Sequence, residues 1–393
     1  MGNKYLIIGS GRQGAAAAYD LAKKPETEQV ILADVILDRA ATSCERVNKL
    51  TGKSNASPVP LDIKNKNDLI SFLRKADAAV SAVPYYNNLE IVQCAIEAGT
   101  SMCDLGGNTE LVFHELELND AAIEKEVTIV PDCGMVPGLG TSVCMYAMSL
   151  VDQPEEVFLF DGGIPKNPEP PWNYILTFHF EGLINEYSGT TEFLREGKIV
   201  IIPCFEEYEL IEFPQPIGQL EAFTTAGGTS TAPRTFLGKL KTYQNKTLRY
   251  KGHFQQWKTL RDAGLFDEEP VKVGSQKIRP RDLLEAVLNP KIVAKPKEED
   301  ICIIRAKCIG LRDGRRVEAI VDLFDYYDHE TGFTAMERTT GFHAAMVAAE
   351  LAAKQVRPGA IPIELAIPGR LIIEGCKQRG MIVTEKISTK SDV

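Results

Sequence analysis

Apolar runs and helix-forming stretches alternate along residues 5–130. Continuous apolar runs of about four to eight residues, bounded by turn residues, are typical of strands that are buried on both faces. The predicted strands are 5–8, 30–34, 57–61, 78–83, 101–104 and 127–130, and the predicted helices are 15–22, 36–50, 67–75, 88–98 and 110–125. This alternation predicts an α/β fold with a Rossmann-type doubly wound parallel sheet.

A different pattern begins near residue 134. Residues 132–140 are dense in turn formers and lead into an apolar helical run at 141–150, which indicates a crossing between domains. The remainder predicts a second α+β domain, largely antiparallel, for substrate binding and dimerisation. An Asp-Gly pair at 313–314 predicts a hairpin between its last two strands. Its predicted strands are 156–162, 174–180, 198–203, 219–225, 247–250, 301–309 and 316–325, and its final helices are 335–356 and 368–380.

The length supports more than one domain, because a chain of 393 residues exceeds the size at which a single core usually grows. The expected boundaries are 1–133 for dinucleotide binding, 134–340 for substrate binding and oligomerisation, and 341–393 for helices that return to the first domain.

Composition narrows the class of partner. A formal charge of −10 disfavours nucleic acid or an anionic membrane, because either would require a basic face. No stretch approaches the length of a membrane span and no signal peptide is recognisable, so the expected location is cytoplasmic. The nine cysteines lack Cys-x-x-Cys pairs, so neither a metal site nor a disulfide framework is predicted. Small-molecule chemistry fits this profile.

The turn after the first strand carries the pattern Gly9-x-Gly11-x-x-Gly14, and an acid, Asp34, follows 20 residues after its last glycine. In this context the glycines allow a tight turn, close approach of a pyrophosphate, and packing of the helix on the strand. Asp34 is placed to accept ribose hydroxyls and would repel a 2′-phosphate, so NAD is favoured over NADP. The cofactor-binding candidates in this segment are Gly9, Ser10, Gly11, Arg12, Gln13, Gly14 and Asp34.

Further candidates follow the other predicted strands, since ligands of such sheets meet the carboxyl ends of the strands. Asp62 has two possible roles, contact with the adenine or simply the end of a strand. The cofactor-binding candidates outside the first turn are Asp62, Ala82, Val83, Leu105, Gly106 and Met135.

Several strings resemble the saccharopine dehydrogenase superfamily and, within it, the NAD-dependent lysine 6-dehydrogenases. The resemblance extends from the first strand to about residue 290. It implies oxidative deamination of L-lysine at the ε-amine to 2-aminoadipate 6-semialdehyde, which cyclises, with release of ammonia. The strings are 9–14 with Asp34, 104–107, 131–132 with 137–138, 162–165 with 168–171, 181–182, 220–223, 227–231, and 247–250 with 252–253.

The implied reaction requires a cation for the α-carboxylate of the substrate and a base for its ε-ammonium. Arg234 and Arg249 are the candidate cations, each with an alternative role as a structural salt bridge. Asp104 has an alternative role as a helix cap. The substrate-binding candidates are Tyr174, Arg234, Thr247 and Arg249, and the catalytic candidates are Asp104, Asp132, Glu181 and His253.

Two other functions stay open. One is reductive condensation of the type that forms saccharopine or carboxynorspermidine, although Val136 stands where the related saccharopine-forming enzymes have an aspartate. The other is a non-catalytic NAD-binding sensor. The expected partners are the small-molecule substrate, L-lysine or a related amino acid or diamine, and further copies of the chain in a homodimer or homotetramer.

Overall fold

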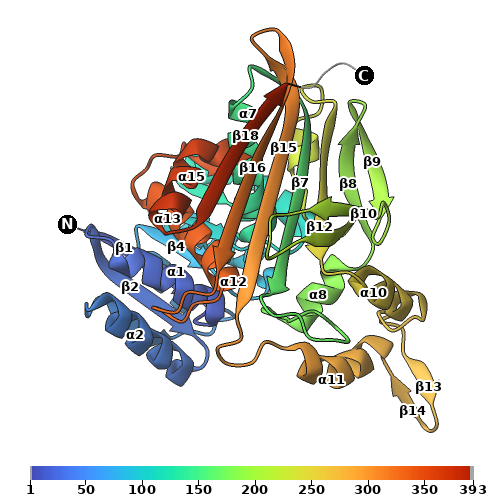
Figure 1. The fold of residues 1–393 in the computed structure, drawn as a ribbon. Helices are drawn as coiled ribbons and strands as arrows, with labels where there is room; N and C mark the ends of the chain where they lie inside the picture. The colour runs from blue at the N-terminus through green and yellow to red at the C-terminus, as the bar shows by residue number, and fades with distance from the viewer. Residues whose placement is uncertain (1, 390–393) are drawn as a thin grey trace.

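The computed structural model describes residues 2–389, which form two large sheets and a small hairpin (Figure 1). We refer to the parallel sheet and its helices as the first lobe, and to the mixed sheet and its helices as the second lobe. The candidate site lies where the two lobes meet. No helix in the described part of the chain combines the length and the apolar composition that crossing a bilayer requires.

The first lobe contains a seven-stranded sheet in the order β17-β6-β5-β4-β1-β2-β3, with every pair parallel. This confirms the predicted Rossmann-type sheet. Its central strands are apolar because helices cover both faces, so both sets of alternating side chains are buried. The strands are β1 (Asn3–Ile8), β2 (Thr27–Asp34), β3 (Ala56–Pro60), β4 (Ala78–Ser81), β5 (Ser101–Asp104), β6 (Thr128–Val130) and β17 (Gly359–Ala360).

Two helical layers enclose this sheet. Helix α1 packs with α2 and α13 on one face, and α3 packs with α4 on the other. The helices of the chain up to residue 124 are α1 (Arg12–Lys23), α2 (Leu37–Thr51), α3 (Lys66–Leu73), the 3-10 turn η1 (Tyr85–Asn87), α4 (Asn88–Ala98), α5 (Thr109–Leu116) and α6 (Asn119–Glu124).

The second lobe is built on a nine-stranded sheet in the order β10-β11-β12-β7-β15-β16-β18, with β8 paired to β12 and β9. All its pairs are antiparallel except β7 with β12. The predicted hairpin joins β15 to β16, with Asp313 and Gly314 in the turn. The strands are β7 (Gln153–Pro165), β8 (Thr190–Arg195), β9 (Lys198–Pro203), β10 (Glu209–Glu212), β11 (Gln219–Phe223), β12 (Thr242–Arg249), β15 (Asp300–Arg312), β16 (Arg315–Tyr326) and β18 (Ile382–Thr389).

Residues 174–180, predicted as a strand, pair only through an isolated bridge between Leu176 and Val293. Their apolar side chains join a cluster with Trp257 and Phe205 instead, so their hydrophobicity reflects packing and not a sheet ladder. The remaining elements of this lobe are η2 (Met135–Leu139), α7 (Gly140–Ser149), α8 (Phe180–Glu186), α9 (Ala232–Thr235), α10 (His253–Asp262), α11 (Pro280–Ile292), and the hairpin β13 (Val271–Val273) with β14 (Gln276–Ile278).

The C-terminal segment divides between the lobes, whereas the sequence predicted that all of 341–393 returns to the first domain. Helix α13 packs on α1, β4 and β5, and β17 extends the parallel sheet. Strand β18 instead pairs with β16, which would otherwise leave a long unpaired edge, and α15 packs on α7. Residues 390–393, which end the predicted segment 341–393, lie outside the described part of the chain. The elements are α12 (Ala335–Glu337), η3 (Arg338–Phe342), α13 (His343–Ala352), α14 (Ile363–Ala366) and α15 (Gly369–Gln378).

Candidate active site

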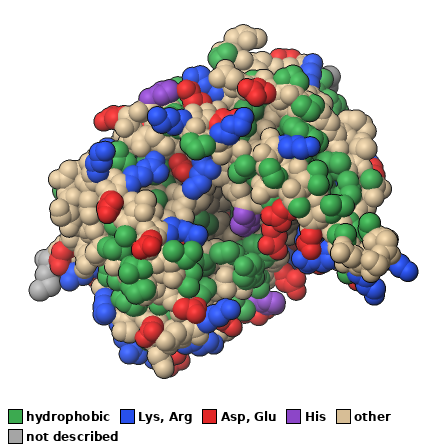
Figure 2. Space-filling view, turned by 90° about the horizontal axis from the view of Figure 1, so that it is seen from below, with side chains coloured by type: hydrophobic (Ala, Val, Ile, Leu, Met, Phe, Trp, Pro, Cys, Tyr) green, Lys and Arg blue, Asp and Glu red, His purple; other side chains and the backbone are tan. Residues whose placement is uncertain are grey.

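A cavity of about 950 Å³ lies between the carboxyl ends of the parallel strands and the second lobe. Seen from below, the molecule is hollowed between its two halves, with acidic side chains at the rim (Figure 2). One end is lined by Gly11, Arg12 and Gln13 of the first turn, and the other end by Asp161 and Arg249 of the second lobe. A single space therefore joins the nucleotide motif to the second sheet.

The glycine-rich turn has the geometry that its motif predicts. Gly9 has a φ of 99°, and a Cβ there would lie 2.6 Å from the carbonyl oxygen of Ala82. A Cβ at Gly14 would overlap the carbonyl oxygen of Gly9. Gly11 is different, because a Cβ there would meet nothing within 4 Å and the residue lines the cavity. Gly11 is also the N-cap of α1 without a side-chain cap, so this open space suits the pyrophosphate of a dinucleotide.

We expect Gly11→Ala and Gly14→Ala to fail in different ways. The φ of −66° at Gly11 is ordinary for alanine, so this variant should keep its melting temperature but bind a dinucleotide about tenfold or more weakly. Gly14→Ala should destabilise the protein by about 1–3 kcal/mol, because α1 must move away from the turn. Thermal melts and calorimetric titrations with NAD and with NADP measure both effects. Equal loss of stability in the two variants would contradict the separate roles.

Asp34 ends β2 below the same turn. Its carboxylate accepts hydrogen bonds from Ser10 N (3.0 Å), Ser10 Oγ (2.8 Å) and Ile36 N (2.9 Å). Although burial alone raises the pKa of Asp34, these hydrogen bonds hold it below the ordinary value, so the group stays charged. Arg39 Nη1 lies 3.8 Å from the carboxylate and lines the cavity.

The other cofactor candidates fall into three positions. Gly9, Ser10 and Gly14 shape the turn beneath the cavity without lining it. Asp62 is exposed and accepts a hydrogen bond from the backbone N–H of Lys64, so the structure does not bring it to the cavity and favours its role at the end of a strand. The candidates that line the cavity are Gly11, Arg12, Gln13, Ala82, Val83, Leu105, Gly106 and Met135.

Three buried carboxyl groups gather at the ends of β5 and β6. Asp104 Oδ1 accepts hydrogen bonds from Gly106 N (2.7 Å) and Asp132 N (3.4 Å). Asp104 itself does not line the cavity, and Asn108 rather than Asp104 caps the next helix, through Leu111 N. Asp104 therefore fixes the backbone of Asp132 in position.

Protonation separates the roles of these groups. Burial and the charge of Asp104 raise the pKa of Glu115 to about 11, so Glu115 is protonated and hydrogen-bonds to Asp104. Burial also raises the pKa of Asp132 to about 8, despite the hydrogen bond that it accepts from Ser230 Oγ. Asp132 lines the cavity, so it is a carboxylate whose proton affinity suits a general base near neutral pH.

At the other end of the cavity, Arg249 of β12 is 4% exposed. Its Nε donates to Tyr187 Oη (2.8 Å), its Nη2 to Glu186 Oε1 (3.0 Å) and its Nη1 to the carbonyl oxygen of Leu248 (2.9 Å). A guanidinium has five N–H donors, so two are left at the wall of the cavity. Arg249 can therefore hold a carboxylate.

The remaining sequence candidates lie at different distances from this cluster. Tyr174 lines the cavity, and Thr247 hydrogen-bonds to Glu186 behind it. His253 is buried behind Tyr187, with Nε2 2.8 Å from Tyr187 Oη, and burial lowers its pKa well below the ordinary value. A neutral, enclosed imidazole of this kind fits a supporting position better than a proton shuttle.

The last two candidates, Arg234 and Glu181, also lie outside the cavity. Arg234 pairs with Glu192 through Nε (2.9 Å) and Nη2 (2.8 Å), and its guanidinium covers the ring of Phe113 with its side chain 55% exposed. This is its alternative role as a structural salt bridge. Glu181 is exposed near the start of α8 and does not line the cavity. Neither is positioned to reach a ligand bound there.

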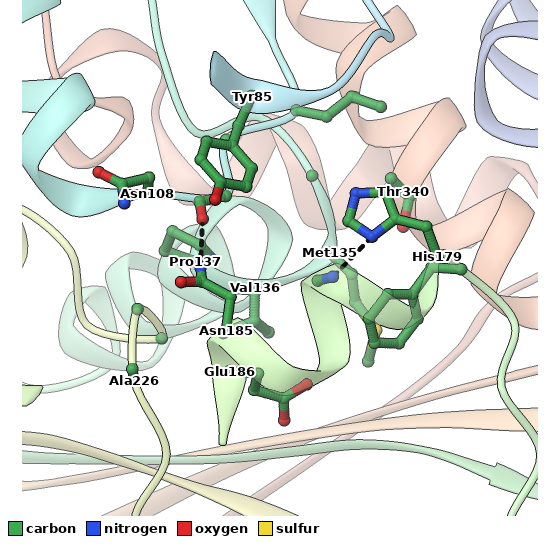
Figure 3. A pocket seen from close by; sticks show the side chains of 18 of the residues that line it. Tyr85, Asn108, Met135, Val136, Pro137, His179, Asn185, Glu186, Ala226 and Thr340 are labelled. Atoms are coloured by element: carbon green, nitrogen blue, oxygen red, sulfur yellow. Dashed lines mark hydrogen bonds between the residues drawn. The ribbon is translucent and has the colours of Figure 1, made fainter. Parts of the chain in front are cut away.

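Sequence reasoning missed several residues of the site. Figure 3 shows Tyr85 and Asn108 on the side of the first lobe, and Asn185 and Glu186 on α8, with Asn185 close to Tyr85. Asn185 Nδ2 donates to the carbonyl oxygen of Gly107 (2.9 Å), which joins the lobes across the cavity. The signal for Asp161 was present, since an acid directly follows the apolar run 157–160 inside the predicted strand 156–162. The site residues that were missed include Tyr85, Asn108, Asp161, Asn185, Glu186 and Asn245.

Known proteins share both halves of this arrangement. Residues 5–130 match the family model of the saccharopine dehydrogenase NADP binding domain, and residues 134–381 match that of the saccharopine dehydrogenase C-terminal domain. A curated relative, the NADP(+), L-glutamate-forming saccharopine dehydrogenase of Saccharomyces cerevisiae, is 21% identical over 327 residues, covering 80% of this chain and 70% of the relative. The solved apo structure of saccharopine dehydrogenase (L-Glu forming) from the same organism superposes with a TM-score of 0.78 at 18% identity, covering 99% of this chain and all of that one.

Proposed function

This chain belongs to the saccharopine dehydrogenase family of oxidoreductases, and from the residues of its cavity we propose that it oxidises L-lysine at the ε-amine with NAD, releasing ammonia. Loss of hydride from the carbon that bears the ε-amine gives an imine, which water hydrolyses to ammonia and 2-aminoadipate 6-semialdehyde, and this product cyclises. The proposal uses the cavity as the place where the substrate meets a nicotinamide cofactor.

The charged side chains that line the cavity are the main support for this proposal. Among the described residues that line it there is no lysine, and the arginines are Arg12, Arg39 and Arg249. Arg12 and Arg39 belong to the nucleotide end, which leaves Arg249 as the one guanidinium beside the acids of the second lobe. Saccharopine carries three carboxylates and lysine carries one. A pocket with one guanidinium and several acids therefore favours lysine.

The residues divide the work of the reaction. The two remaining donors of Arg249 bind the α-carboxylate, which extends the side chain of lysine toward the first lobe. Asp132 accepts a proton from the ε-ammonium, whose ordinary pKa is about 10.4, because only the neutral amine can lose hydride. Ser230 and the Asp104 carboxylate orient Asp132. When bound, the nicotinamide ring of the cofactor accepts the hydride.

We further propose NAD as the cofactor. Asp34 is held in its charged form by Ser10 and Ile36, and a fixed carboxylate at the end of β2 repels a 2′-phosphate. Arg39, 3.8 Å away, is already neutralised by this carboxylate. The name of the family model and of the yeast relative refers to NADP, so the preference has to be measured.

The test is a steady-state assay of the full chain with lysine, ornithine, saccharopine and cadaverine, each with NAD and with NADP. We expect reduced cofactor and ammonia in equal amounts from lysine, with NAD preferred by about tenfold or more. Asp34→Ala should narrow the ratio between NAD and NADP, because it removes the repulsion and leaves Arg39 free.

The same assay tests the alternatives. Reductive condensation of the saccharopine type is favoured by the name of the yeast relative, and it predicts oxidation of saccharopine with release of glutamate and no ammonia from lysine. A non-catalytic NAD-binding sensor predicts cofactor binding with no turnover of any amine. Either result would overturn the proposed reaction.

A further inference from the structure

Asp161 occupies an unusual place for a carboxylate. It lies in β7, between Thr247 of β12 and Ile304 of β15 in the middle of the mixed sheet, and it lines the cavity. Asn245 Nδ2 donates to its Oδ1 (2.7 Å). Within residues 2–389 no hydrogen bond reaches Oδ2, so half of this carboxylate is left for a ligand.

The neighbours of Asp161 fix it in position. Asn245 also donates to the carbonyl oxygen of Leu159, so both of its amide protons are directed to β7. The absence of a side chain at Gly228 makes room for the Asn245 oxygen, which a Cβ there would overlap. Asp161 is therefore presented to the cavity by a rigid support.

Glu186 places a second carboxylate beside the same cation. Its Oε1 accepts from Arg249 (3.0 Å), and its carboxylate is also a hydrogen-bond partner of the Thr247 side chain. The charges of Glu186 and Arg249 both act on Asp161. Two partly buried carboxylates thus lie near one guanidinium, and only Glu186 is in contact with it. A carboxylate withdrawn from water without a cationic partner is costly, and a ligand cation reduces that cost.

We propose that Asp161, assisted by Glu186, binds the α-ammonium of the substrate while Arg249 binds its α-carboxylate. The two opposite charges of an α-amino acid head group then match two opposite charges on the wall of the cavity. This inference rests on the proposed oxidation of lysine, and it makes the enzyme specific for free α-amino acids over simple ω-amines.

The pKa shifts of Asp161 and Glu186 agree with a site that binds the cationic group of a ligand. Burial raises the pKa of Asp161 to about 7, and the nearby Glu186 carboxylate raises it while Asn245 and Arg249 lower it. Burial likewise raises the pKa of Glu186. Both shifts have the direction expected of carboxylates whose counter-charge arrives with the ligand.

The experiment compares lysine with 6-aminohexanoate, which is lysine without its α-amino group. Wild type, Asp161→Asn and the control Glu206→Gln, an exposed acid of the same lobe, are each assayed with NAD. Lysine and 6-aminohexanoate are also titrated by calorimetry into the protein saturated with NADH. Wild type should prefer lysine by about a hundredfold in kcat/KM and in affinity, because the analogue leaves the partly buried Asp161 without a partner.

Asp161→Asn should lose most of this preference: lysine weakens by about 10- to 100-fold through KM, while 6-aminohexanoate changes by less than about threefold. Equal losses for both ligands, or a wild type that binds both equally, would overturn the inference. If 6-aminohexanoate is oxidised as well as lysine, the inference fails and the deamination stands. If neither is oxidised but calorimetry shows the preference, the proposed reaction fails and the head-group site stands.

Discussion

Asp132→Asn is expected to lower kcat/KM for lysine by roughly a hundredfold to ten-thousandfold, the usual contribution of a general base. Asparagine keeps the shape of the side chain and can still accept the hydrogen bond from Ser230, but it cannot take a proton from the ε-ammonium. In wild type the rate should fall as the pH drops through about 8, where Asp132 becomes protonated. The variant should lack this limb of the pH profile.

The same substitution should not reduce stability. The pKa of Asp132 is raised in the folded state, so its contribution to stability is fully present below the unfolded value of about 3.9 and is lost as the pH rises through about 8. Asparagine stays neutral throughout. The melting temperature of Asp132→Asn should therefore exceed that of wild type most clearly above pH 8 and match it near pH 4.

Ser230→Ala is the companion variant. It removes a hydrogen bond that favours the charged form of Asp132, so the acidic limb should move to higher pH without disappearing. Loss of activity in Asp132→Asn that merely follows a drop in melting temperature would refute the catalytic role.

Arg249→Lys is expected to raise the KM for lysine by about 10- to 100-fold with a smaller change in kcat. The replacement side chain at position 249 keeps the positive charge opposite Glu186, but it loses the planar guanidinium and with it the hydrogen bond to Tyr187. A lost charge-assisted hydrogen bond is worth about 1.5–3 kcal/mol, which corresponds to this range. The replacement is lysine and not alanine, because alanine would leave the partly buried Glu186 without a counter-charge.

Arg234→Lys provides the matched control. Arg234 is in the same lobe but pairs with Glu192 at the surface, so the substitution should change KM by less than about twofold. Initial rates over a range of lysine concentrations at saturating NAD measure both variants. An increase in KM for Arg234→Lys as large as that for Arg249→Lys would contradict the proposal that Arg249 binds the α-carboxylate of the substrate.

The nucleotide-binding half was predictable because its rules are local. Gly9, Gly11, Gly14 and Asp34 lie in a single segment, and the required strand, turn and helix follow one another in the sequence. The structure confirms the sheet that this segment begins and assigns each glycine a distinct steric environment. The apolar runs also predicted that both faces of that sheet are buried.

The substrate half was not predictable in the same way, because its residues meet only through the register of separate elements. Asp161, Glu186 and Arg249 come from β7, α8 and β12. From the sequence alone Arg234 was the stronger candidate of the two, whereas in the structure the glutamate that each arginine meets places Arg249 at the cavity and Arg234 outside it. Glu181 was chosen over Glu186 on the same short helix, although only the second faces the cavity.

The division of the C-terminal segment restricts how ligands come and go. The chain crosses between the lobes after β6, after β16 and again before β18, and one continuous apolar core contains Ile7 of the first sheet, Leu159 of the second and Ile373 between them. A hinge motion that separated the two lobes would disrupt the packing of this shared core. Substrate exchange must instead use the hollow between the two halves, where the bond from Asn185 to Gly107 joins the lobes and motion is confined to the rim.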